Sequence, residues 1–233
     1  MTNGRLYGVG VGPGDPELLT LKALRLLRQC PVIVYQSADD SESVARGIVA
    51  QYLTGNQIEV QYHLPRALDP EAAQPIYDKV VTPIAEHLTA GRDVAVLCEG
   101  DPLFYGSFMY VFTRLSENFE TEVVPGVSSP MGCASALGVP ICYRNDVFSV
   151  LPATLAAENL EAQLLNSQAF AIIKLRRHLT KVRDVLNKLG MISRARYIER
   201  GTMAHQRIVS LQEVDPANVP YFSMILIPSI TKL

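Results

Sequence analysis

The chain has 233 residues, 48% of them apolar and 19% charged, which is enough for one large globular domain or two small ones. Its 21 lysines and arginines are balanced by 23 acidic residues, so no overall positive charge attracts a nucleic acid. Four cysteines stand far apart without a CxxC pair, and no apolar run approaches the ~20 residues of a membrane-spanning helix. We therefore expect a cytoplasmic protein with no nucleic-acid or membrane partner, no disulfide framework and no protein-bound metal.

The opening stretch LYGVGVGPGDPELLTLKALRLL predicts a buried strand over 5–12 that turns sharply into a helix, with Asp15 before Pro16 as the helix N-cap. A proline at position 83 predicts a kink or break in the helix expected at 72–91. Further strands are predicted at 31–36, 58–64, 93–98 and 120–126, with helices between them. This alternation indicates an α/β fold with an open, mostly parallel sheet that carries helices on both faces.

Three glycine-bearing turns, at 12–15, 99–102 and 125–129, each follow a predicted strand. Ligands of such sheets bind beyond the carboxyl ends of the strands. The third glycine of a dinucleotide GxGxxG motif would fall on Pro13 or Asp15, and no lysine follows as in a phosphate-binding P-loop. Asp15 and Asp101 would repel a phosphate but not a ligand with an ammonium, a sulfonium or ribose hydroxyls. That chemistry fits S-adenosylmethionine, with a plain strand-to-helix connection as the alternative.

The second part of the chain is richer in strands. Strands are predicted at 148–154, 169–175, 194–200, 206–211 and 221–229, with helices only around 156–166 and 178–189. We therefore predict two domains, an N-terminal α/β domain over 1–145 that carries the glycine-rich loops and a smaller C-terminal mixed α/β domain over 146–233.

Four segments together resemble the tetrapyrrole methyltransferases, and within them the precorrin-2 C20-methyltransferases of vitamin B12 synthesis: GVGVGPGDPELLTLKA, CEGDPLFYGSFMYV, VVPGVSS and YIERGTMAHQRIV. The resemblance covers nearly the whole chain in order. It implies the tetrapyrrole methylase fold, a homodimer, and S-adenosylmethionine bound in a cleft between the two domains. It also implies methyl transfer to carbon 20 of precorrin-2 or of its cobalt form, leaving S-adenosylhomocysteine.

Carried onto this sequence, the resemblance implies ten donor-binding residues: Pro13, Glu99, Gly100, Asp101, Phe104, Ser128, Ser129, Leu175, Gly201 and Thr202. The tetrapyrrole is a polycarboxylate, so basic side chains are expected on its side of the cleft. The densest basic cluster is KLRRH, and we predict substrate contacts from Lys174, Arg176, Arg177 and Arg144.

The donor is already activated by its sulfonium charge, so the protein's task is to align donor and acceptor and to exclude water. No catalytic triad is required, and no general base is assigned from the sequence. The isolated His63, His87 and His205 lack metal-ligand spacing and are interpreted as surface or core residues. Two alternatives stay open: a methylase of the same fold with another acceptor, such as a ribosomal RNA ribose or a modified histidine of elongation factor 2, and a non-catalytic regulator that binds S-adenosylmethionine.

Overall fold

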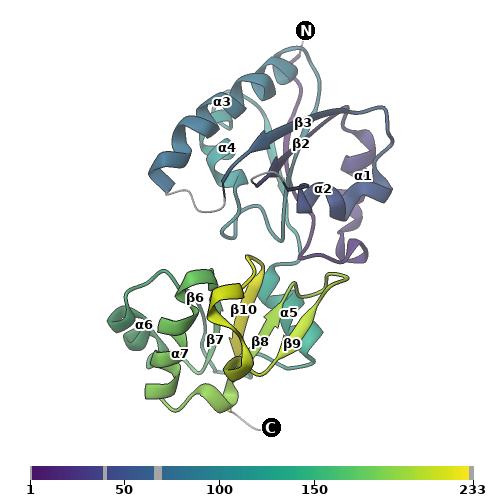
Figure 1. Cartoon of the computed structure of the whole chain (residues 1–233). Coiled ribbons are helices and arrows are strands. Elements are labelled where there is room, and N and C mark those ends of the chain that lie inside the picture. The colour runs from purple at the N-terminus through teal and green to yellow at the C-terminus, as the bar shows by residue number, and fades with distance from the viewer. Residues whose placement is uncertain (1, 39–40, 66–69, 231–233) are drawn as a thin grey trace. The chain divides into compact units, whose positions relative to one another are not determined.

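The protein is described by a computed structural model that covers residues 2–38, 41–65 and 70–230. The chain forms two compact units, Met1–Ser128 and Ser129–Leu233 (Figure 1). Each contains one five-stranded sheet with helices against both faces.

The sheet of the first unit is entirely parallel, with the strand order β3-β2-β4-β1-β5. Its strands are β1 (Leu6–Gly10), β2 (Val32–Ser37), β3 (Ile58–His63), β4 (Val94–Cys98) and β5 (Thr121–Val124). The residues of β1 and β4 are buried throughout, which explains their continuous apolar character. This confirms the predicted parallel sheet.

Helices cover both faces of this sheet. Buried residues of α1 (Leu21–Gln29) and α2 (Val44–Val49) pack on one face, and those of α3 (Pro70–Thr89) and α4 (Phe108–Leu115) pack on the other. The 3-10 turn η2 (Ala50–Tyr52) extends α2. α3 runs continuously through Pro75 and Pro83, so the helix is not broken at Pro83, where the sequence predicted a kink or a break.

The predicted helix start at Asp15 was wrong, and the helix after the Asp101-Pro102 pair also begins later than that pair indicates. Asp15 caps only the short 3-10 turn η1 (Pro16–Leu18), because Leu19 and Thr20 return to extended backbone, and α1 begins after Thr20, its own N-cap. After Asp101 the chain makes a turn in which Tyr105 has a left-handed φ of 55°, which an α-helix cannot contain. α4 therefore begins only at Phe108.

The sheet of the second unit is mixed, with the strand order β6-β7-β10-β8-β9. Its strands are β6 (Phe148–Pro152), β7 (Ala169–Ile173), β8 (Arg196–Glu199), β9 (Arg207–Val209) and β10 (Ser223–Ile227). Both β7 and β8 pair antiparallel with β10, so their carboxyl ends lie at the same edge. All five strands lie inside the predicted ranges.

Helices α6 (Ala157–Leu164) and α7 (Leu179–Lys188) pack on one face of this sheet, and α5 (Ser129–Leu137) packs on the other. Four 3-10 turns lie in the connections: η3 (Arg176–His178), η4 (Ile192–Arg194), η5 (Leu211–Glu213) and η6 (Pro216–Asn218). A Cβ atom on Gly201 would lie 2.6 Å from the Cys133 Sγ atom, so α5 approaches the sheet closely. The small residues of this helix, SPMGCASAL, allow that close approach.

The division into compact units falls earlier than the predicted boundary near residue 146. Helix α5, which follows the last strand of the first sheet in sequence, packs on β8 and β10 of the second sheet. Strand-helix alternation continues through this helix, so the sequence pattern alone did not indicate the sheet to which it belongs.

Candidate functional site

The three glycine-bearing turns follow β1, β4 and β5, which are neighbours in the sheet. The Gly100 amide donates to the Gly12 carbonyl at 2.8 Å, and the Gly12 amide donates to the Gly100 carbonyl at 3.3 Å. These two bonds form an antiparallel bridge between the first two turns. Because the strands are parallel, all three turns lie at the same carboxyl edge of the sheet.

The glycines allow these turns to pack on one another. A Cβ atom on Gly126 would lie 2.1 Å from the Gly100 carbonyl oxygen, and one on Gly10 would lie 2.5 Å from the Gly126 nitrogen. Both contacts are far shorter than any side chain permits. Gly10, one of the alternating glycines of the opening stretch, is therefore needed because the backbone of the turn after β5 passes too close to leave room for a side chain.

Asp101 ties two of the turns together through its carboxylate. Its Oδ1 atom accepts a hydrogen bond from the Leu103 amide at 2.9 Å, and its Oδ2 atom accepts one from the Gly126 amide at 3.1 Å. The side chain thus holds its own turn and the turn after β5. Asp101 therefore fixes the shape of this edge.

The turns of the first unit suit a cationic ligand better than a phosphate. They carry Asp15, Glu99 and Asp101 but no lysine or arginine. Glu99 and Asp101 are partly buried, so their charges are less screened than at an open surface. Residues of this kind fit a sulfonium-bearing donor with ribose hydroxyls.

The other predicted donor residues of the first unit lie on the same turns. Pro13 is buried after β1, and Phe104 is half-buried beside Tyr105, with ring centroids 5.1 Å apart. Ser128 is the last residue of the first unit, and Ser129 is the first of the second.

A second candidate edge lies in the second unit, at the carboxyl ends of β7 and β8. Four residues there have left-handed backbone: Lys174 (φ 60°), Arg176 (φ 24°), Arg200 (φ 49°) and Thr202 (φ 68°). Such conformations are strained for residues with side chains, and they cluster at ligand sites. The predicted Lys174, Arg176, Gly201 and Thr202 are thus brought to one edge.

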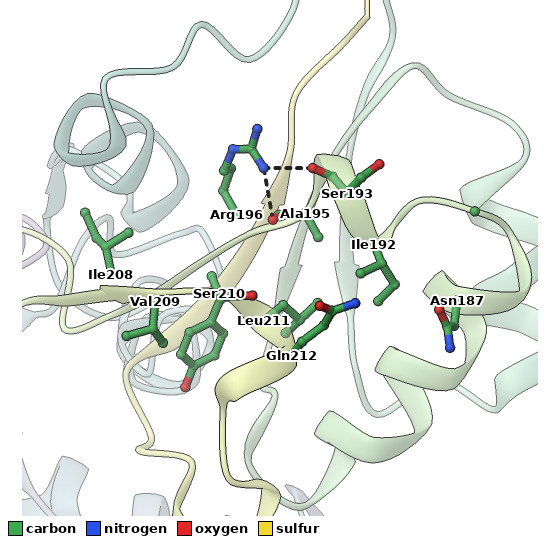
Figure 2. Close-up of a pocket in the computed structure, with 12 residues that line it drawn as sticks. Asn187, Ile192, Ser193, Ala195, Arg196, Ile208, Val209, Ser210, Leu211 and Gln212 are labelled. Carbon is green, nitrogen blue, oxygen red and sulfur yellow. Dashed lines mark hydrogen bonds between the residues drawn. The ribbon is translucent and has the colours of Figure 1, made fainter.

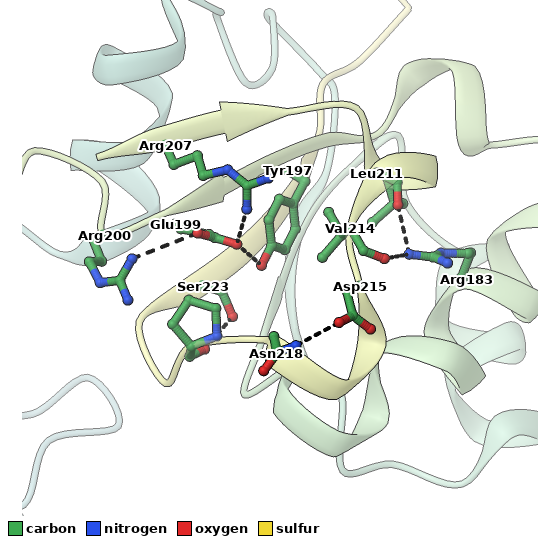
Figure 3. Close-up of polar contacts among 11 residues, drawn as sticks. Arg183, Tyr197, Glu199, Arg200, Arg207, Leu211, Val214, Asp215, Asn218 and Ser223 are labelled. Carbon is green, nitrogen blue, oxygen red and sulfur yellow. Dashed lines mark hydrogen bonds and ion pairs between the residues drawn. The ribbon is translucent and has the colours of Figure 1, made fainter. Parts of the chain in front are cut away.

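A buried carboxylate anchors this edge (Figure 3). Glu199 is 4% exposed, and its Oε1 atom accepts hydrogen bonds from the Tyr197 hydroxyl at 2.9 Å and from Arg207 at 3.3 Å. Arg200 forms an ion pair with its other oxygen at 3.7 Å. Burial and the bond to Glu199 raise the pKa of Tyr197. Sequence reasoning missed Glu199 and Arg207, because an acid at the end of the short strand RYIE, next to Arg200, resembles an ordinary surface charge.

Not every predicted residue joins this group. The Leu175 side chain is fully buried in the core on α7, so only its backbone can face a ligand. Arg144 lies shortly before β6. The Val147 amide donates to the Gln168 side chain, so the start of β6 lies beside the start of the parallel strand β7. This arginine therefore lies at the opposite edge from the exposed Lys174, Arg176 and Arg177.

A groove of about 710 Å³ lies elsewhere in the second unit (Figure 2). It is lined by η4, the first residues of β8, and the stretch from β9 to η5, including Arg196 and Ile208. Arg196 donates to the Ser193 carbonyl at 2.9 Å, which holds its guanidinium against η4. None of the predicted donor or substrate residues lines this groove.

Among the described residues no three or more His, Cys, Asp or Glu side chains are grouped as they would be around a metal ion. Burial raises the pKa of Cys98 to about 11 and those of Cys30 and Cys133 to about 12, while Cys142 is exposed. No helix in the described part of the chain is both long and apolar enough to cross a membrane.

The sequence model of the Tetrapyrrole (Corrin/Porphyrin) Methylases matches residues 5–215. The chain belongs to this family. Among tetrapyrrole methylases it is 40% identical to the precorrin-2 C(20)-methyltransferase of Sinorhizobium sp., over 97% of this chain and 95% of the relative. It is also 40% identical to the cobalamin biosynthesis protein CobIJ of Mycobacterium tuberculosis, of which it spans only 46%, about half the length.

A solved tetrapyrrole methylase has the same fold. The uroporphyrin-III C-methyl transferase of Thermus thermophilus, crystallised in complex with S-adenyl homocysteine, superposes with a TM-score of 0.69 at 27% identity. The match covers 97% of this chain and 92% of that structure. The tetrapyrrole methylase fold expected from the sequence motifs is confirmed.

Proposed function

We propose that this chain transfers a methyl group from S-adenosylmethionine to carbon 20 of precorrin-2 or cobalt-precorrin-2, in cobalamin biosynthesis. The observation that carries the proposal is the 40% identity to a precorrin-2 C(20)-methyltransferase over nearly the full length of both chains. The turns after β1, β4 and β5 support it, because they combine tight backbone packing with acidic side chains and no basic ones.

We propose that the donor contacts the turn residues Pro13, Glu99, Gly100, Asp101, Phe104 and Ser128 of the first unit. From the second unit we propose Ser129, the Leu175 backbone, Gly201 and Thr202. When bound, the donor supplies an electrophilic methyl group on a sulfonium, which an electron-rich macrocycle carbon can attack directly. The residues of this chain orient the donor and exclude water.

The proposal is tested by an anaerobic methyl-transfer assay with S-adenosylmethionine and precorrin-2, with and without cobalt in the macrocycle, followed by mass spectrometry. We expect one methyl group to be gained by one of the two forms. Calorimetric donor binding without methyl gain on either form would favour another acceptor or a non-catalytic regulator. Absence of donor binding would overturn the donor site itself.

The tetrapyrrole's carboxylates are proposed to contact Lys174, Arg176 and Arg177 at the β7 edge. The double variant Arg176→Ala/Arg177→Ala is expected to raise the KM for the tetrapyrrole about tenfold or more at unchanged donor affinity. A hydrogen bond to a charged group contributes about 1.5–3 kcal/mol, and about 1.4 kcal/mol corresponds to tenfold.

The matched control for this prediction is Arg25→Ala/Arg28→Ala, which removes two arginines from α1. We expect it to leave both constants unchanged. A KM for the tetrapyrrole that is the same in both double variants would reject the β7 edge as the substrate site. Arg144 is proposed as a weaker contributor, since it lies at the other edge of the sheet.

We further propose that the active form is a cytoplasmic homodimer. The family resemblance supports the dimer, and the exposed thiol of Cys142 is consistent with a reducing compartment. Any cobalt would enter with the tetrapyrrole.

A further inference from the structure

Three polar side chains form a hydrogen-bonded group at the ends of β2 and β3. Ser37 and His63 are the last residues of these strands and lie directly opposite each other in the parallel register. The Ser37 Oγ atom is 2.8 Å from the His63 Nδ1 atom and 2.9 Å from the Gln61 Nε2 atom. Ser37 is only 1% exposed, so this group is held by the sheet.

The hydrogens of this group can be assigned in a way that satisfies every member. A hydroxyl donates one hydrogen and accepts two. The Ser37 hydroxyl donates to the Tyr62 carbonyl, 3.4 Å away, and accepts from the Gln61 amide and from the His63 Nδ1–H. The second ring nitrogen of His63, Nε2, then carries a lone pair. Because His63 is exposed, a ligand can approach that nitrogen.

This group lies at the edge that carries the glycine-bearing turns. β2 pairs with β4, with Ile33 opposite Ala95 and Val34 opposite Val96. All strands of this sheet are parallel, so Ser37, His63 and the turn after β4 lie at the same carboxyl edge. β3 lies next to β2 and two strands from β4. A tetrapyrrole macrocycle is wide enough to extend across two strand spacings of about 4.8 Å each.

Methyl transfer to a ring-bridging carbon leaves a proton to be removed. The carbon–sulfur bond breaks with its electron pair left on sulfur, and a new carbon–carbon bond forms from macrocycle electrons. The acceptor carbon then carries both its hydrogen and the methyl group. Loss of that hydrogen as a proton returns the carbon–hydrogen electron pair to the macrocycle. Both carboxylate oxygens of Asp101 are engaged by backbone amides, so Asp101 is poorly arranged for this step.

We propose that His63 is the general base that accepts this proton, on its Nε2 atom, and that Ser37 and Gln61 are positioning residues. The inference rests on the proposed function. After the transfer both ring nitrogens carry hydrogen, and the Nδ1–H bond to Ser37 stabilises the imidazolium. The proton then passes to water.

The test compares His63→Ala, His63→Gln and the parent chain in the methyl-transfer assay. A positioned general base contributes about 10²–10⁴-fold, so kcat is expected to fall at least about 100-fold in both variants, with donor affinity unchanged. Added imidazole is expected to restore part of the activity of His63→Ala but not of His63→Gln, in which the glutamine fills the space. Deuterium at the acceptor carbon is expected to slow His63→Ala more than the parent.

The control is His87→Ala, because His87 accepts a hydrogen bond from Arg92 at 2.9 Å at the opposite end of β4. It should keep the parent kcat. Long-range ¹H–¹⁵N correlation spectra, which need no turnover, should show His63 protonated on Nδ1, and Ser37→Ala should shift this signal.

A His63→Ala variant with a kcat within about threefold of the parent, or a spectrum with the proton on Nε2, would overturn the role of His63. Lack of turnover by the parent chain would instead overturn the proposed function, and the base assignment with it.

Discussion

Gly126→Ala is expected to lower the free energy of unfolding by about 1–3 kcal/mol and to abolish measurable binding of S-adenosylmethionine. The new Cβ atom would lie 2.1 Å from the Gly100 carbonyl oxygen and 2.9 Å from the Gly10 Cα atom, so the backbone of at least one turn must move. Since the atoms in conflict belong to the backbone, no side-chain rotation can relieve the clash. Urea unfolding and titration calorimetry measure the two effects.

Gly47→Ala is the matched control for this substitution. Gly47 lies inside α2, and a Cβ atom there would meet no heavy atom within 4 Å. Alanine is favoured over glycine in a helix interior, so we expect a gain of about 0.5–1 kcal/mol with donor binding unchanged. Donor binding by Gly126→Ala at the parent affinity would contradict the assignment of these turns to the donor site.

Asp101→Ala is expected to weaken donor binding about 10- to 100-fold while the protein stays folded. The substitution removes the acceptor for two backbone amides, those of Leu103 and Gly126, and so frees the turn after β4 from the turn after β5. Hydrogen bonds to a charged group contribute about 1.5–3 kcal/mol each. Without them the turns are less ordered in the free protein, so donor binding must also pay the free energy of ordering them. Titration calorimetry with S-adenosylmethionine measures the loss.

Two further variants distinguish a change within the turn after β4 from the loss of the hydrogen bond that joins it to the turn after β5. Asp101→Asn keeps an oxygen acceptor and should give an intermediate affinity. Asp215→Ala removes a similar aspartate from an Asp-Pro turn, whose Oδ1 accepts from the Ala217 amide at 3.0 Å, in the second unit. It should bind the donor as the parent does. If Asp101→Ala retained the parent affinity, the turn after β4 would not be part of the donor site.

The sequence predicted the strands well because both sheets have simple signals. β1 and β4 are buried on both faces and appear as unbroken apolar runs, and β7 and β10 do the same in the second unit. Ser43 stands just before the apolar helical pattern of α2, and as its N-cap it accepts a hydrogen bond from the Arg46 amide at 3.3 Å. An N-cap depends only on residues close together in the chain, so the sequence alone can indicate it.

The sequence was a poorer guide to helix starts and to which sheet a helix covers. Asp101 before Pro102 has the letters of an N-cap, yet its carboxylate accepts from Gly126, which lies 25 positions along the chain. Likewise α5 has no strong apolar face, and only its packing against β8 and β10 places it in the second unit. A pattern in neighbouring residues cannot report a partner that is distant in sequence.

By itself, therefore, the sequence determined which segments form strands, the parallel character of the first sheet, the family motifs and the acidic character of the turns. The tertiary structure decided which turns touch. It brought Gly10, Gly100 and Gly126 into backbone contact, gathered Lys174 and Arg200 at one edge, moved Arg144 to the other, and paired His63 with a buried Ser37. The physical reason is that strand order and register set these distances, and both arise from long-range pairing that local sequence does not encode.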